Sequence, residues 1–267
     1  MKNIIVNLII MSMFMFLISP NFVYGESNKT YGWGFNKKDN NEPPEVGKYK
    51  QILSKYNGIY IDDSGDKVVY LTFDNGYEAG HTSKILDVLK KKKVPATFFV
   101  TGHYVKSQPE LIKRMVKEGH IIGNHTYRHP ENLTSVSKQR IEKELRKLED
   151  AVADISEQKT MKYLRPPKGV FSERTLSITQ DLGYMNVFWS LALVDWNKGK
   201  EQGWQQAYKK VIKQMHPGAV ILLHTVSKDN ADALEHLIDE LRKRGYTFQS
   251  LDDLMMKNMV PRSILGL

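Results

Sequence analysis

The chain has 267 residues, with 39 lysines and arginines, 30 aspartates and glutamates, and no cysteine. The lack of cysteine excludes a disulfide-stapled scaffold, a cysteine-ligated metal centre and a cysteine nucleophile. A hydrophobic fraction of 41% is too high for a disordered protein and suits one large α/β domain or two small ones. The net charge of +9 indicates an anionic partner, which could be nucleic acid, a membrane surface or an acidic polymer.

The first 25 residues have the pattern of an export signal. Lys2 precedes an apolar run over residues 4–18, Pro20 ends any helix, and Val23-Tyr24-Gly25 is typical of a signal-peptidase site. We predict a signal peptide over residues 1–25; the alternative is an uncleaved membrane anchor, since the run is only slightly short for a membrane span. Either way the rest of the chain is exported, where basic charge meets wall polymers before DNA. We therefore expect no nucleic-acid partner and no membrane contact beyond this segment.

Residues 26–66 are predicted to form an irregular N-terminal arm and a leading hairpin strand. The arm is polar and rich in asparagine, but Tyr31, Trp33 and Phe35 lie close together in it. Aromatic side chains of this kind bury a large apolar area, so we expect them to fix the arm to the domain. The alternative is a flexible linker.

From Lys67 the sequence alternates between strand-like and helix-like segments. The expected strands cover residues 68–73, 96–101, 120–124, 163–164, 187–191, 219–223 and 246–248. Most of the intervening segments carry apolar residues at helical spacing. This alternation predicts parallel βα units, and hence a barrel or an open doubly wound sheet. No change in composition divides residues 67–254, which we expect to form a single domain, followed by a tail over residues 255–267.

Titratable side chains follow most of the expected strands. They are Asp74, His125, His129, Arg165, Lys168, Asp195 and His224. In parallel α/β folds the reactive groups lie beyond the carboxyl ends of the strands, so these side chains should meet at one face.

The histidines and carboxylates suggest specific roles. His125 and His129 are four residues apart, so on one helical turn both rings would face the same way and could share a metal; they could equally be surface residues. Asp74 ends an apolar strand, where a carboxylate needs a partner, and Arg165 could keep it ionised. His224 is either a working acid or a structural histidine.

Asp195 could orient His224, as a second carboxylate often does for a working imidazole. A metal, a carboxylate base and an imidazole acid together suit metal-assisted hydrolysis of an amide or ester. The chain has no glycine-rich cradle for a nucleotide, which disfavours hydride or phosphoryl transfer. Tyr127 and Trp196 could stack on a sugar ring or simply pack in the core. His81, His103, His120, His216 and His236 are given no role.

At these motifs, the sequence resembles the polysaccharide deacetylases of carbohydrate esterase family 4, which contain the NodB homology domain. The resemblance covers roughly Lys67 to Leu254 and implies a distorted, incomplete (β/α)7 barrel. It also implies removal of N-acetyl groups from chitin, peptidoglycan or related glycans, with a zinc-like divalent ion. By this resemblance, Asp74 is the catalytic base and Arg165 holds it, while His224 is the general acid and Asp195 tunes it. His125 and His129 are the metal ligands. The backbone N–H of Lys168 helps to stabilise the oxyanion.

One position departs from the family pattern. The motif usually reads Thr-Phe-Asp-Asp, and its second aspartate binds the metal, whereas this chain has Asn75. An amide oxygen is a neutral and weaker ligand, so we expect Asn75 to contact substrate or to bind the metal only weakly.

The same motif narrows the resemblance. Residues 72–78, Trp33-Gly34-Phe35 and residues 224–227 look like those of the spore-cortex peptidoglycan N-acetylmuramic acid deacetylases, which produce muramic δ-lactam. This branch implies action on peptide-free glycan strands. We expect a monomer, exported to the cell wall or the forespore intermembrane space. Two alternatives stay open: a deacetylase of N-acetylglucosamine or chitin-type glycans, and a glycan-binding module that has lost catalysis through Asn75.

Overall fold

The computed structural model describes residues 25–39, 41–197, 199 and 201–259. The predicted signal peptide, apart from Gly25, lies outside these residues. Within them, no helix combines the length and the apolar character needed to cross a membrane.

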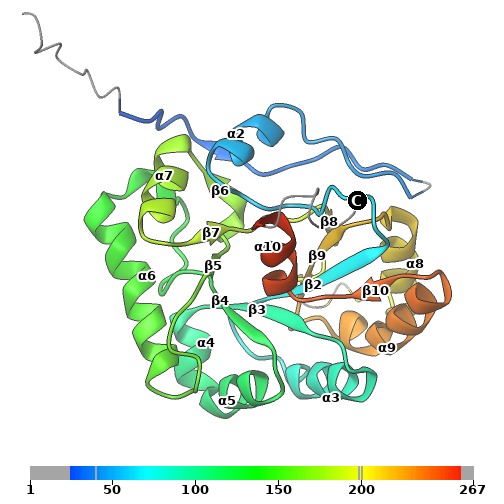
Figure 1. Cartoon of the computed structure of the whole chain (residues 1–267). Coiled ribbons are helices and arrows are strands. Elements are labelled where there is room, and N and C mark those ends of the chain that lie inside the picture. Colours follow the sequence, from blue (N-terminus) through cyan, green and yellow to red (C-terminus); the bar gives the residue numbers. More distant parts are fainter. Residues whose placement is uncertain (1–24, 40, 198, 200, 260–267) are drawn as a thin grey trace, which may run out of the picture.

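The described chain alternates strands and helices (Figure 1). The strands are β1 (Tyr31–Gly32), β2 (Val68–Asn75), β3 (Ala96–Val100), β4 (Ile121–Asn124), β5 (Tyr163–Leu164), β6 (Val170–Phe171), β7 (Met185–Asn186), β8 (Leu191–Ala192), β9 (Ala219–His224) and β10 (Thr247–Phe248). The α-helices are α2 (Tyr49–Lys55), α3 (Thr82–Lys92), α4 (Gly102–Ser107), α5 (Pro109–Lys117), α6 (Lys138–Ala153), α7 (Glu173–Asp181), α8 (Trp204–Gln214), α9 (Lys228–Lys243) and α10 (Leu251–Met259). Two short 3₁₀ turns are η1 (Leu133–Ser135) and η2 (Pro167–Gly169).

The main sheet is parallel, with the strand order β7-β5-β4-β3-β2-β9-β8 and with β10 beside the start of β2. Its central strands are apolar along their whole length because both faces are covered, as parallel sheets require. Helices α3 to α9 surround the curved sheet (Figure 1). The sequence-based expectation of a single-domain, incomplete barrel of alternating strands and helices is confirmed.

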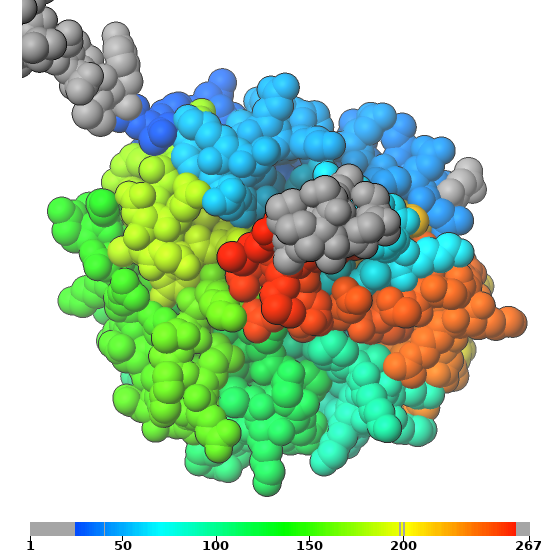
Figure 2. Space-filling model, in the orientation of Figure 1, coloured from blue at the N-terminus to red at the C-terminus, as the bar shows by residue number. Residues whose placement is uncertain are grey.

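The two faces of β2 enter two different parts of the core. Leu71 and Phe73 pack with the surrounding helices, whereas Val68 and Tyr70 point into the barrel interior. There they meet Leu251 of α10, which closes the amino end of the sheet. Figures 1 and 2 show α10 over the centre of that end, with the arm beside it. The carboxyl ends of the strands therefore open on the opposite side of the molecule.

Three sequence-based expectations need correction. The strand expected at residues 187–191 is mostly not a strand: residues 187–190 connect β7, which pairs with β5, to β8, which begins at Leu191 and pairs with β9. The arm is not wholly irregular, since it contains α2. The expected boundary at residue 254 falls inside α10, whose Leu251 and Leu254 are buried.

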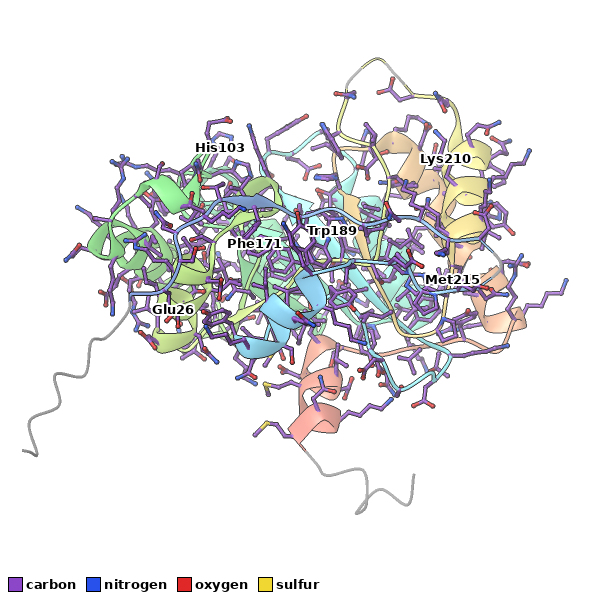
Figure 3. All side chains as sticks on the ribbon, turned by 90° about the horizontal axis from the view of Figure 1, so that it is seen from above. Glu26, His103, Phe171, Trp189, Lys210 and Met215 are labelled. Atoms are coloured by element: carbon purple, nitrogen blue, oxygen red, sulfur yellow. The ribbon has the colours of Figure 1, made fainter. Side chains whose placement is uncertain are left out.

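The N-terminal arm is fixed by its aromatic side chains, as expected. Trp33 is only 9% exposed, and its ring lies 4.8 Å from that of Phe188. Its indole N–H donates a hydrogen bond to the carbonyl of Trp189, and β1 pairs with β6. Figure 3 shows Phe171 and Trp189 in the middle of the molecule, within reach of this segment. The arm thus supports the chain between β7 and β8 that approaches the site described next.

Candidate active site

The carboxyl ends of the central strands bring most of the predicted site residues together. Asp74 at the end of β2 lies directly opposite His224 at the end of β9 in the pairing of these strands. Both line a cleft that also contains His125 and His129. Figure 3 places His103, another residue of this cleft, on the side of the molecule away from α10.

A buried ion pair lies at the base of the cleft. Arg165 is 0% exposed and donates from Nη1 to Asp74 Oδ1 at 2.8 Å. Its other nitrogens donate to the hydroxyl of Thr72 and to the carbonyls of Val187 and Phe188. The guanidinium also stacks 4.1 Å from the ring centre of Phe99. These contacts hold the guanidinium of Arg165 in place, and the guanidinium in turn positions the carboxylate of Asp74.

The ion pair determines the charge of Asp74. Burial by itself would raise the pKa of this carboxyl. The Arg165 guanidinium, with smaller contributions from His125 and His224, outweighs burial and holds the pKa of Asp74 below its ordinary value. Asp74 is consequently an anion at neutral pH. Its second oxygen, Oδ2, does not bond to Arg165 and lies 3.5 Å from His125 Nε2.

His125 is held as a neutral imidazole. Its Nδ1 lies 2.8 Å from the carbonyl of Arg165, which can only accept, so Nδ1 carries the proton and Nε2 presents a lone pair. Burial lowers the pKa of His125 to about 4, despite the opposing charge of Asp74. A neutral imidazole whose second nitrogen is fixed by a carbonyl is the usual form of a histidine metal ligand.

His129 lies beside His125, with 4.7 Å between their ring centres. The predicted helical turn is wrong: residues 125–129 form a loop in which Thr126 and His129 have φ angles of 64° and 52°. Bonds from Thr126 N to Asn124 Oδ1 and from His129 N to Thr126 Oγ1 stabilise this loop. It still brings the two rings together, although by a different backbone path from a helix.

His224 is tuned in the opposite direction from His125. Asp195 Oδ1 accepts from His224 Nδ1 at 2.7 Å, and Asp195 Oδ2 accepts from the His224 backbone N–H and from Asn230. Burial would lower the pKa of His224, but the hydrogen bond and charge of Asp195, helped by Asp74, raise it above its ordinary value. The cation is therefore favoured, and Nε2 is the ring nitrogen that remains available.

Aromatic and cationic residues form the walls of the cleft. Tyr127 lies against the backbone of Gly102, where a Cβ atom would come within 2.5 Å of its ring. Trp196 is 47% exposed, with its ring 5.1 Å from that of His224. Sequence reasoning missed Lys106, Arg128 and His103, which also line the cleft. His103 and Lys106 follow the end of β3, so the strand-end rule applied to that strand would have found them.

Lys168 and Asn75 are placed less directly than the others. Lys168 has a φ angle of 56° within η2, and its ammonium pairs with Glu131; its side chain is not among those lining the cleft. Asn75 is 0% exposed, and neither polar atom of its amide has a hydrogen-bond partner of ordinary geometry among the described residues. A buried amide without an ordinary hydrogen bond, next to the carboxylate of Asp74, calls for an explanation, and a bound ion is one of the known ones.

His125 and His129 are candidate ligands for a divalent ion. Two neutral imidazoles are good ligands, and Asn75 would add a neutral amide oxygen instead of a carboxylate. Across the described part of the chain, no group of three or more histidine, cysteine, aspartate or glutamate side chains is arranged to hold a metal ion. The two histidines fit such an ion by their chemistry, but the titratable side chains of the described residues do not complete a ligand set around it.

Comparison with known proteins identifies the family. A family model described as polysaccharide deacetylase matches residues 62–187. The peptidoglycan-N-acetylmuramic acid deacetylase PdaA of Bacillus subtilis is 52% identical over 231 residues, which are 86% of this chain and 88% of that protein. The chain belongs to the polysaccharide deacetylases. This confirms the resemblance inferred from the motifs.

Solved structures of polysaccharide deacetylases agree with this assignment. The structure of Bacillus subtilis PdaA, a family 4 carbohydrate esterase, matches with a TM-score of 0.85 and covers 87% of this chain and 99% of that one. A family 4 carbohydrate esterase from Bacillus anthracis is 49% identical, with a TM-score of 0.73 over 86% and 98% of the two chains. Family 4 deacetylases are in general metalloenzymes.

The opposite tuning of the two histidines can be tested directly. Histidine titration by NMR should show His125 neutral throughout the range from about pH 5 to 8, and His224 with a pKa above the ordinary value of about 6.5. Because Asp195 stabilises the cation, Asp195→Asn should lower the pKa of His224. The stability that His224 contributes is complete below its ordinary pKa and is lost as the pH rises through the raised one. An unchanged pKa of His224 in Asp195→Asn would contradict the assignment of Asp195.

Proposed function

We propose that this polysaccharide deacetylase removes the N-acetyl group from N-acetylmuramic acid in peptide-free peptidoglycan strands. The observation that carries the proposal is the pairing across β2 and β9 of an anionic carboxylate, Asp74, with a histidine whose cation is favoured, His224. Hydrolysis of an amide needs both a base and an acid in these states at the same pH. The 52% identity to a muramic acid deacetylase supports the choice of sugar.

In the proposed reaction, Asp74 removes a proton from the attacking water as it adds to the acetamide carbonyl. The backbone N–H of Lys168 stabilises the developing oxyanion. His224 Nε2 then protonates the departing sugar nitrogen, while Asp195 accepts from Nδ1, which stabilises the imidazolium before the transfer and fixes the orientation of the ring. Arg165 keeps Asp74 charged and oriented. Trp196 and Tyr127 offer ring faces on which the sugar can stack.

A divalent ion would be held by His125 and His129, with Asn75 as a weak third ligand. When bound, such an ion supplies Lewis-acid polarisation of the acetamide carbonyl. The fixed tautomer of His125 prepares one of the required lone pairs. Because Asn75 is neutral, the site should exchange its ion more readily than a site that contains a second carboxylate.

For the biological setting, we infer an exported protein that acts on wall glycan during formation of the spore cortex, where the freed amine closes the muramic δ-lactam. The net charge of +9 suits anionic lactyl groups and wall polymers. A deacetylase of N-acetylglucosamine or chitin-type glycans remains the competing function. A glycan-binding module is disfavoured, because the base, the acid and their supporting partners are all present and correctly paired.

The proposal is tested by the mass of the product. The mature protein, with a divalent metal, is incubated with peptidoglycan strands stripped of peptide. Acetate release is measured, and the sugars of the treated strands are analysed by mass spectrometry. We expect loss of acetyl mass from muramic acid, and a further loss of water if the lactam closes. Loss of acetyl mass from glucosamine alone would favour the competing function, and no acetate with any metal would favour the binding module.

The role of Asp74 is tested by Asp74→Asn. The amide keeps the shape and can still accept from Arg165, but it cannot take a proton, so acetate release should fall by roughly 10²–10⁴-fold. Circular dichroism should show a folded protein that melts at a lower temperature, because Arg165 has lost its buried counter-ion. A folded variant with substantial activity would remove Asp74 from the role of base.

The role of Asn75 is tested by metal affinity alone. Asn75→Asp adds a carboxylate beside His125 and His129, so calorimetry should show binding of Zn²⁺ tightened by at least about tenfold, which is 1.4 kcal/mol. His125→Ala in the same background should abolish the gain. Equal affinity of the wild type and Asn75→Asp would show that position 75 does not contact the ion.

A further inference from the structure

The mouth of the cleft carries two cations that the proposed reaction does not use. Lys106 comes from α4, and Arg128 comes from the loop after β4. Both line the same cleft as Asp74 and His224. Neither is needed to move a proton or to hold a metal, so a different function has to account for their place.

Both side chains are exposed at the cleft, and Lys106 is the freer of the two charges. Lys106 is exposed, and its ammonium makes no ion pair within the described part of the chain; it lies 5.8 Å from the ring centre of Tyr127. The side chain of Arg128 is 66% exposed and forms a long ion pair with Glu144, 3.7 Å from Nε to Oε1, so only part of its charge is compensated. The carboxylate that lines the cleft, Asp74, is instead neutralised by Arg165. The mouth of the cleft is therefore positive.

The two cations are also held on one wall. The backbone N–H of Gly102, in the first turn of α4, donates to the carbonyl of Tyr127 at 3.0 Å. The Tyr127 ring lies so close to Gly102 that no side chain would fit there. This contact joins α4 to the loop that carries Arg128, so Lys106 and Arg128 are presented from a single rigid unit.

The proposed substrate carries a negative charge, the lactyl carboxylate, close to its acetamide group. N-acetylmuramic acid differs from N-acetylglucosamine by a lactyl ether on the ring carbon next to the one that bears the acetamide. When the acetamide lies between Asp74 and His224, the lactyl group on the neighbouring ring carbon is close enough to reach a wall of the same cleft. N-acetylglucosamine has only a hydroxyl group there and offers nothing to a cationic wall.

We propose that Lys106, assisted by Arg128, forms a subsite for the lactyl carboxylate and thereby selects muramic acid over glucosamine. This inference rests on the proposed function and adds to it the residues that recognise the sugar. The subsite attracts a carboxylate in the ground state and in the transition state alike, so its loss raises KM more than it lowers kcat.

The test compares two forms of one substrate. Peptide-free glycan strands with free lactyl carboxylates are assayed beside the same strands with those carboxylates converted to neutral methyl esters, and acetate release is measured. Lys106→Met should lose about tenfold in kcat/KM on the free acid, as expected for one charge-assisted contact. On the ester it should stay within about twofold of the wild type. Arg128→Gln should show the same pattern with a smaller loss.

Lys117→Met is the matched control. Lys117 is an exposed lysine at the end of α5, just before β4 begins, so it lies at the opposite end of the sheet from the cleft. The Lys117→Met substitution removes the same charge as Lys106→Met and should leave the preference for the free acid unchanged. Melting temperatures of all three variants should stay close to that of the wild type, because the altered side chains are exposed.

Two results would overturn the subsite. One is a loss in Lys106→Met that is equal on the acid and on the ester; the other is a double variant, Lys106→Met with Arg128→Gln, that keeps full preference for the acid. A wild type that releases acetate from chitin oligomers but from neither muramic substrate would instead overturn the proposed function, and the subsite with it. The two failures are therefore distinguished by the wild type alone.

Discussion

The buried ion pair between Arg165 and Asp74 is the interaction on which the rest of the site depends. Arg165 is fully buried and contacts Thr72 on β2 and the carbonyls of Val187 and Phe188, so it joins the centre of the sheet to the segment between β7 and β8. Removing one partner of such a pair costs about 3–5 kcal/mol, because the other charge stays buried without compensation. The arm contributes to this arrangement, since Trp33 packs on Phe188 and bonds to Trp189.

Two strands of the same sheet, β4 and β9, end at or just before histidines with opposite properties. His125 is buried against a backbone carbonyl, which keeps it neutral, whereas His224 faces the carboxylate of Asp195, which favours its cation. Asp74 lies between them and is anionic. One residue type thus serves as a candidate metal ligand and as a candidate acid within a single cleft, because the neighbouring groups differ.

Much of the fold and the site can be predicted from the sequence, because strand periodicity and strand ends are local signals. The apolar run of β2 and the residues after it place Asp74 at the carboxyl end of a buried strand, and the same logic finds His224. The change from an expected strand at residues 187–191 to a connection between β7 and β8 is not a local signal, since it depends on which neighbouring strands are available for pairing. The loop of His125 and His129 depends on bonds from Asn124 and Thr126 that a spacing rule does not contain. Lys106 is an ordinary exposed lysine in the sequence, and only the contact between Gly102 and Tyr127 shows which wall it occupies.

The most direct test of this account is the ionisation of Asp74 in the folded protein. Carbon-13 NMR of labelled aspartate side chains, with Asp74→Asn used to assign the resonance, would follow its protonation as the pH is lowered. The account predicts that Asp74 remains ionised below the ordinary aspartate pKa of about 3.9, because Arg165 and the neighbouring histidines together outweigh the effect of burial. An Asp74 that becomes protonated at or above that value would show that burial dominates, and the ion pair could then no longer explain the charge of the proposed base.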